Sequence, residues 1–351
     1  MIKGWSALPL TRRHLLHGAS VAALAGLARR AHAAGGTIAV SNWGGDWNDR
    51  TVRFVEAPLV EPQGYRILHE LALEPERKVK LLAEKRLHHG TIDVIHLNDS
   101  DAYEMHRQDV LEPLDLARIP NDADVVPALR RPYFVPWLYS GVVILYNPAK
   151  VPAPPQSYED LWDARWSGRL GITNQLYFMY LMMAGLIKGG NMTNAESGKT
   201  RLAALKTLVN PRIYGTHQQL AAGLANGEVD LAVNYKARGL QWAHDGLPLR
   251  VKYPAEGAIS ITFGACLPKR APDPDGAYVY LNAMLDRAAM AGLSEASFYA
   301  PANAKAALSE AIRRQVDFSP DEQRRLHSAD YAYVSDNTSQ WLEWWNEHIT
   351  S

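Results

Sequence analysis

The stretch that decides the fold is TIAVSNWGGDWNDRTVRFVEAPLVEPQGYRILHEL, residues 37–71. It opens with a β-rich run at 37–40, which ends in a Gly-rich turn at 42–47. A helical pattern follows through Phe54 and gives way to Pro and Gly, which stop helices. The run at 65–71 then reads as a second strand. A strand, a helix and a second strand in this order predict a parallel pair with the helix packed across it.

The same alternation continues beyond this stretch. An amphipathic helix is predicted at 76–87, and a third strand at 93–97 ends in the polar turn 98–101. Ligands of parallel sheets bind beyond the carboxyl ends of the strands. The turns at 42–47 and 98–101 both occupy that place, so they are the first candidates for a binding site.

A second α/β set follows a connector. A strand at 141–146 precedes the Pro-rich segment 152–155, and an apolar, β-rich run at 258–267 brings the chain back toward the first set before mainly helical sequence. Two domains fit the length of 351 residues. Between the Pro-rich segment 152–155 and the run at 258–267, the predicted elements are strands at 170–172 and 229–233 and helices at 177–187 and 195–208.

The N-terminus has the pattern of an export signal. The pair Arg12-Arg13 precedes a short apolar stretch at 18–27, and Ala31-His32-Ala33 follows as a cleavage site. A basic region, a short apolar core and an Ala-x-Ala site predict a signal peptide over residues 1–33. The paired arginines favour the twin-arginine route, in which proteins fold before export. A disordered basic N-terminus is the alternative. The predicted location is the periplasm.

Composition excludes some functions. The first 33 residues carry five basic and no acidic side chains, so 32 basic and 37 acidic residues remain after them. A mildly acidic surface offers no footprint for nucleic acid. Cys266 is the only cysteine, so no disulfide can form within the chain, and its apolar neighbours predict a core position.

An ordered set of short motifs carries a resemblance to a known family. The chain resembles the extracellular solute-binding proteins of ABC importers, specifically the spermidine/putrescine-binding family and its relatives. Each motif alone is weak, but they occur in the family's order over nearly the whole chain beyond residue 33. They are Asn42-Trp43, the run from Asp93 to Asp115, 141–147, 157–163 with 167–170, 227–232, 254–258 and 267–269.

The resemblance implies a type II periplasmic-binding-protein fold of the α/β class. In such a fold two lobes, each a mostly parallel sheet flanked by helices, are joined by crossover strands and close on a ligand. The implied boundaries are 34–146 for the first part of lobe 1, 147–263 for lobe 2, and 264–351 for the return to lobe 1 plus C-terminal helices. The crossings are expected near Tyr146-Asn147 and near 262–264.

The resemblance also assigns the lobe 1 side of a ligand site. Trp43 matches the family's first aromatic position, and Asp46 or Trp47 falls where a second aromatic normally lies. After the third strand, Asn98 and Ser100 match ligand-contacting positions, with Asp99 beside them. Aromatic faces and carboxylates together suit an organic ammonium ion. The alternative is structural, since Trp43 can be a packing lid and Asn98 a helix N-cap.

In lobe 2 the chain departs from the polyamine pattern. Tyr235 matches an aromatic wall, but Ile261 stands at the family's Trp position and Phe263 at its carboxylate position. Lys236 would repel a diamine. The ligand is therefore expected to be a polyamine or a related compound with an amine, carboxylate, phosphonate or hydroxyl groups. The remaining candidate ligand residues are Tyr139, Asn174, Gln175 and Tyr177.

Other functions are less well supported by the sequence. No Ser-elbow, zinc-protease or phosphate-loop motif occurs, so neither an enzyme nor a cofactor is expected. An Fe(III)-binding protein of the same architecture is the alternative, with Tyr235 and Tyr177 as its phenolate candidates. The expected partners are a small-molecule ligand and an ABC permease with its ATPase. A monomer is expected.

Overall fold

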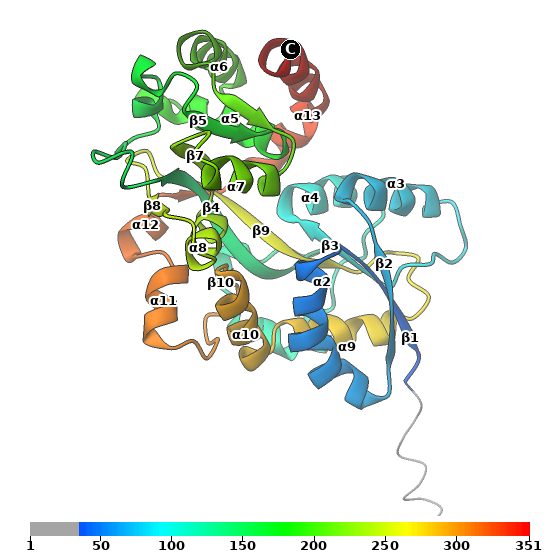
Figure 1. The fold of residues 1–351 in the computed structure, drawn as a ribbon. Coiled ribbons are helices and arrows are strands. Elements are labelled where there is room, and N and C mark those ends of the chain that lie inside the picture. The colour runs from blue at the N-terminus through cyan, green and yellow to red at the C-terminus, as the bar shows by residue number, and fades with distance from the viewer. Residues whose placement is uncertain (1–34) are drawn as a thin grey trace, which may run out of the picture.

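Two lobes joined by long strands make up the protein in a computed structural model that describes residues 35–351 (Figure 1). The predicted signal peptide lies outside the described residues. Within the described part, no helix combines the length and the hydropathy that crossing a membrane requires. The strands run in the order β2-β1-β3-β9-β4-β7-β5-β6, a curled α/β sheet that both lobes share. This confirms the predicted fold class.

Lobe 1 is built on the stretch at residues 37–71. Strand β1 (Thr37–Asn42) pairs in parallel with β2 (Arg66–Leu71) and β3 (Val94–Asn98), as predicted. Helix α2 (Asp46–Thr51) continues as the π-helix Val52–Val60 and a 3₁₀ turn (Glu61–Gln63). The chain therefore stays helical past Pro58, and Gly64, at φ 92°, ends the helical segment because glycine tolerates the left-handed region.

Helices flank this part of the sheet. The core between them contains, among others, Ile38, Val40, Trp137 and Tyr280, all essentially unexposed. Burial of such apolar side chains is the main stabilising contribution to the lobe. The helices of lobe 1 are α3 (Glu74–Glu84), α4 (Asp99–Arg107), α9 (Pro274–Met284) and α10 (Arg287–Ser297).

Lobe 2 carries a second sheet with its own core. Strands β5 (Leu170–Thr173), β6 (Arg212–Tyr214) and β7 (Leu231–Tyr235) are parallel, and β7 lies antiparallel to the end of β4. The short β8 (Arg250–Lys252) also pairs with β4. The helices of this lobe are α5 (Tyr177–Leu186), α6 (Ala195–Val209), α7 (His217–Ala225) and α8 (Lys236–His244).

Two long strands connect the lobes. Strand β4 (Val135–Tyr146) pairs with β9 (Ala258–Cys266) up to Gly141, and from Val142 onward it pairs with β7 instead. The small strand β10 (Ala300–Pro301) also lies beside the first half of β4. The sheet thus changes lobes at Gly141–Val142, a few residues before the expected crossing at Tyr146.

The C-terminal segment returns to both lobes. Helix α13 (Tyr331–Trp345) ends in the π-helix Asn346–Thr350 and buries Trp341 and Trp345 in the core of lobe 2, where the Trp345 ring stacks on Tyr180. Tryptophan spacing along this helix predicts such docking. At its start, the Tyr331 hydroxyl donates to Asp99 of lobe 1 (2.7 Å). The last helix therefore contacts both lobes (Figure 1).

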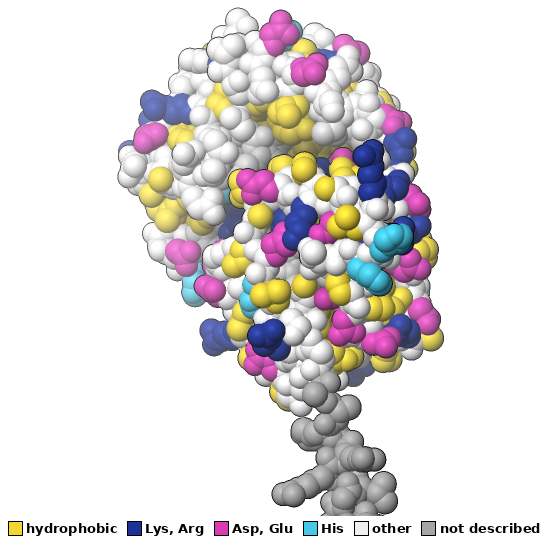
Figure 2. Space-filling model, turned by 90° about the vertical axis from the view of Figure 1, so that its right-hand side faces the viewer, with side chains coloured by type: hydrophobic (Ala, Val, Ile, Leu, Met, Phe, Trp, Pro, Cys, Tyr) yellow, Lys and Arg dark blue, Asp and Glu magenta, His cyan; other side chains and the backbone are white. Residues whose placement is uncertain are grey.

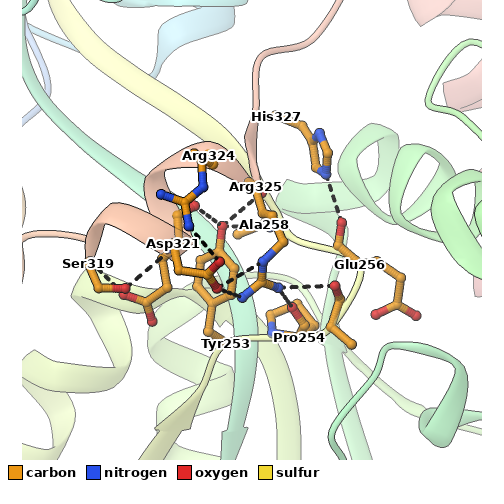
Figure 3. Close-up of polar contacts among 11 residues, drawn as sticks. Tyr253, Pro254, Glu256, Ala258, Ser319, Asp321, Arg324, Arg325 and His327 are labelled. Carbon is orange, nitrogen blue, oxygen red and sulfur yellow. Dashed lines mark hydrogen bonds and ion pairs between the residues drawn. The ribbon is translucent and has the colours of Figure 1, made fainter.

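A polar cluster fixes the start of β9 against the C-terminal segment (Figure 3). Strand β11 (Leu326–His327) pairs in parallel with β9 after helices α11 (Glu310–Val316) and α12 (Pro320–Arg324). The Arg325 guanidinium donates to the carbonyls of Pro254 (3.1 Å) and Ala255 (3.0 Å), and Tyr253 donates to the Arg325 carbonyl (2.8 Å). These contacts position the strand that carries Ile261 and Phe263 into the space between the lobes.

Candidate functional site

A cleft of about 680 Å³ lies between the lobes. Lobe 1 lines it with the turn after β1 and the segment after β2, and lobe 2 lines it with the ends of β5 and β7 and the start of α7. Seven of the predicted site residues are in its wall: Trp43, Asp46, Trp47, Asn98, Gln175, Tyr235 and Phe263. Figure 2 shows hydrophobic side chains gathered where the upper lobe overhangs the lower one.

Aromatic rings form the middle of the cleft. Phe263 packs against Trp43 (5.6 Å between centroids) and Trp47 (5.1 Å) of lobe 1, and against Tyr235 of lobe 2 (6.1 Å). Trp43 also meets Trp47 edge-on at 5.2 Å. Near-perpendicular rings of this kind stabilise one another beyond their buried area. Their faces and edges offer an apolar wall to the methylene groups of a ligand and a π-surface to a cation.

Trp43 has a rigid support. The Arg77 guanidinium lies 4.5 Å from the Trp43 ring centroid and is itself fully buried, with hydrogen bonds from its side chain to the carbonyls of Ala72 and His96. His96 packs edge-on against Trp43, with 6.3 Å between the ring centroids. Burial and the nearby Arg77 charge lower the pKa of His96 to about 3, so this imidazole is neutral.

The carboxylates of the cleft come from lobe 1, and Glu74 is the most perturbed of them. It begins α3, directly after β2, and its Oε1 accepts the backbone N–H of Asn98 (2.8 Å). Burial and the neighbouring Asp101 carboxylate raise the pKa of Glu74 to about 8, against the opposing charge of Arg77. Asp46 lies in the same wall, half exposed, and pairs with Arg50 (2.8 Å).

Asn98 has both of the roles that the sequence left open. It is the N-cap of α4, accepting the backbone N–H of Asp101 through Oδ1 (2.9 Å), and it also lines the cleft. The capping bond holds the amide in place, because Asn at this position satisfies an otherwise unpaired helix N–H.

The lobe 2 wall is polar and carries one cation. Gln175 accepts the backbone N–H of His217 through Oε1 (2.8 Å) and so joins the loop after β5 to the start of α7. Burial, and then the charge of Arg238, lower the pKa of His217 to about 3. Arg238, in the first turn of α8, is the cleft's positively charged side chain on this side.

Asp99 and Ser100 do not line the cleft. Asp99 is buried at the start of α4 and accepts hydrogen bonds from Thr262 N (2.9 Å) and the Tyr331 hydroxyl (2.7 Å), while Ser100 N donates to its other oxygen. Burial raises the pKa of Asp99 to about 6. Its carboxyl group therefore joins elements of the fold, and the structure gives it no access to a ligand in the cleft.

Asn174 and Tyr177 also lie outside the cleft wall. Asn174 Oδ1 accepts the indole N–H of Trp345 (3.0 Å), and the Tyr177 hydroxyl donates to the carbonyl of Thr338 (3.4 Å). Both side chains turn toward α13, because the C-terminal helix packs over this side of lobe 2. A sequence gives no indication of which distant helix will cover a turn.

Tyr139 and Lys236 belong to the junction behind the cleft. Tyr139 stacks on Phe318 (5.9 Å between centroids), and the Lys236 ammonium lies 4.4 Å from the centre of the same ring. Lys236 donates to the carbonyls of Val316 and Asp317 at the end of α11. Lys236 was predicted to line the ligand site, but the cation of α8 in the cleft wall is Arg238, two residues later.

Sequence reasoning missed two residues of the site that a local signal could have found. Glu74 follows the carboxyl end of β2, where a parallel sheet places its ligands. Arg238 lies three residues after Tyr235, the N-cap of α8, and an N-cap residue and the third residue of its helix are neighbours at the helix start. Among residues 35–351, no group of three or more His, Cys, Asp or Glu side chains has the arrangement of a metal site.

Comparisons with known proteins place this geometry in a family. Residues 74–320 match the family model of the bacterial extracellular solute-binding proteins. The putrescine-binding periplasmic protein SpuD of Pseudomonas aeruginosa is 23% identical over 309 residues, 79% of this chain and 83% of that protein. The spermidine/putrescine-binding periplasmic protein of Salmonella typhimurium is 24% identical over 67% of this chain and 70% of its own.

Solved structures share the fold. An ABC transporter substrate-binding protein from Bradyrhizobium japonicum superimposes with a TM-score of 0.79 at 21% identity, covering 90% of this chain and 99% of that one. The fold that these structures share with the chain is consistent with the family model, which matches most of the chain. The chain therefore belongs to the bacterial extracellular solute-binding proteins.

Proposed function

We propose that the protein captures a small, amine-bearing organic solute between its two lobes and delivers it to the permease of an ABC importer. The observation that carries the proposal is the composition of the cleft. Aromatic rings from both lobes surround its centre, and Glu74 supplies a carboxyl group at the lobe 1 side. A desolvated ammonium group needs such a π-face and counter-charge.

Capture follows from the position of the cleft. Trp43 and Glu74 belong to lobe 1, whereas Tyr235 and Gln175 belong to lobe 2, so a ligand in contact with both sets favours the closed arrangement. The strands β4 and β9 connect the lobes, and a hinge there would let the cleft open. The closed form would then dock on the permease.

The polyamine relatives support an amine as part of the ligand. Ile261 and Phe263 in the cleft wall argue against a full polyamine cage, since neither can balance a second ammonium charge. We also propose that the twin-arginine signal at residues 1–33 directs export to the periplasm and that the protein is a monomer.

A thermal-unfolding screen tests the proposed function. The panel contains putrescine, spermidine, ω-amino acids, sugar acids and ferric citrate. A ligand at about 100 times its Kd stabilises the folded state by about 2.7 kcal/mol, and we expect a shift of several degrees with at least one amine. A shift with ferric citrate alone, together with a colour change, would favour the iron alternative and contradict the proposal.

A further inference from the structure

The charges in the cleft are divided between the lobes. Its acidic side chains, Asp46, Glu74 and Glu76, all come from lobe 1. The residues that lobe 2 contributes include Arg238 and no acid. An ion that spans this cleft meets negative charge at one end and positive charge at the other, so the two ends of a well-bound solute must differ in charge.

Glu74 is placed to receive a cation. Its carboxyl group is crowded by Asp101 of α4, which already pairs with Lys78 (2.6 Å). Two neighbouring carboxyl groups repel each other when both are ionised, and an ammonium group beside Glu74 would relieve that repulsion. Arg77, the nearest cation on the same helix, stacks under Trp43 and is fully buried.

Arg238 is placed to receive an anion. It makes no ion pair among the described residues, since its Nη1 donates to the neutral Gln241 (3.0 Å), and its buried Nε has no hydrogen-bond partner. A guanidinium group with free donors binds a carboxylate through two parallel hydrogen bonds. Asp46, an acid of the opposite wall, pairs with Arg50 instead.

The surroundings of Arg238 favour an anion as well. The first residues of α7, His217 and Gln218, lie in the cleft wall, so this helix presents its positive N-terminal end to the ligand space. The Thr216 hydroxyl caps the helix but adds no negative charge. A second ammonium group at this end would be repelled by both the guanidinium group of Arg238 and the positive N-terminal end of α7.

We propose that the cleft selects a zwitterion, a chain whose ammonium group meets Glu74 and whose carboxylate meets Arg238, with its methylene groups between Trp43, Phe263 and Tyr235. The inference rests on the proposed function and narrows it from amine-bearing solutes to amino-acid-type solutes with separated charges. A diamine of the same length matches only one end of the site.

Calorimetric titration of the protein with a matched pair tests the inference. Putrescine and 5-aminopentanoate share the same number of methylene groups and differ in one terminal group, an ammonium in putrescine and a carboxylate in the amino acid. We expect the amino acid to bind at least about tenfold tighter. The substitution Arg238→Gln should weaken 5-aminopentanoate about thirtyfold or more and leave putrescine unchanged or tighter, because loss of one partner of a desolvated ion pair is costly.

Two further variants keep the result interpretable. Arg250→Gln removes an exposed cation of lobe 2 outside the cleft wall and should change neither affinity. Arg238→Lys keeps the charge and should retain part of the binding of 5-aminopentanoate. Two results would overturn the zwitterion inference and leave the proposed function intact. One is putrescine that binds as tightly as 5-aminopentanoate, and the other is an Arg238→Gln variant with unchanged affinity for 5-aminopentanoate. If no member of the wider panel binds, the proposed function fails with it.

Discussion

The rings of Phe263 and Tyr235 meet edge-on, with their centroids 6.1 Å apart and their planes at 86°. Phe263 lies on the connecting strand β9 and packs against the cores of both lobes, whereas Tyr235 ends strand β7 of lobe 2. This contact joins the aromatic walls of the two lobes. A ligand in the cleft therefore touches a continuous apolar surface, and several consequences can be measured.

Trp43→Ala should weaken ligand binding about tenfold, because removal of the ring deletes both a packing surface and a cation–π partner. The folded state should persist, since Trp43 is only partly buried. Trp344→Ala is the matched control, as Trp344 is also partly buried but lies on α13 outside the cleft wall. Calorimetric titration gives the affinities. Equal affinities in both variants would mean that the cleft is not the site.

The affinity for an amine should rise with pH up to the range where Glu74 ionises. Burial and Asp101 raise the pKa of Glu74 to about 8, so at lower pH the group is protonated and must lose its proton when an ammonium group binds. Titration in buffers of different ionisation enthalpy should detect this proton release. Glu74→Gln should abolish it, and a wild-type protein that releases no proton at about pH 7 would contradict the assignment.

Tyr331→Phe should destabilise the fold by about 1–3 kcal/mol above the pKa of Asp99, because the buried carboxylate loses a donor. Burial raises the pKa of Asp99 to about 6, and the Tyr331 hydroxyl counteracts that rise. Below that pH Asp99 is protonated, so the penalty of the variant should shrink. Denaturant unfolding on both sides of the pKa measures this. Tyr103→Phe, on the adjacent ring 6.1 Å away, serves as the control. An equal penalty at both pH values would contradict the role of the charge.

His69 should contribute stability that disappears as pH rises. Its Nε2 lies 2.7 Å from the fully buried Glu56, and that hydrogen bond is the main cause of its raised pKa. A raised folded-state pKa means stability that is present below the unfolded value of about 6.5 and lost as pH rises through the folded pKa. His69→Gln should flatten this part of the pH profile of the free energy of unfolding. An unaltered profile would show that the imidazole is neutral throughout.

Local patterns in the sequence predict the fold of this chain well. Residues 37–40 and 65–71 carry the β-rich pattern of β1 and β2, and their parallel pairing follows from the helix between them. Trp43 and Asn98 lie at the carboxyl ends of β1 and β3, where the topology alone places ligand contacts. Residues whose place depends on nearby elements were therefore predictable.

Residues whose place depends on distant segments were not. Lys236 donates to carbonyls at the end of α11, about 80 residues later in the chain, and Asn174 accepts a hydrogen bond from Trp345. Asp99 is buried by Tyr331 from the last helix. These partners are fixed by how the C-terminal helices pack on both lobes, and no periodicity or spacing near Asp99, Asn174 or Lys236 encodes that packing.

A crystal structure of the protein with the solute that gives the largest thermal shift tests capture between the lobes most directly. We expect electron density for the solute between the lobes, in contact with Trp43 and Glu74 on one side and with Tyr235 on the other. Density for the solute on an outer face, or contacts with one lobe alone, would contradict capture between the lobes.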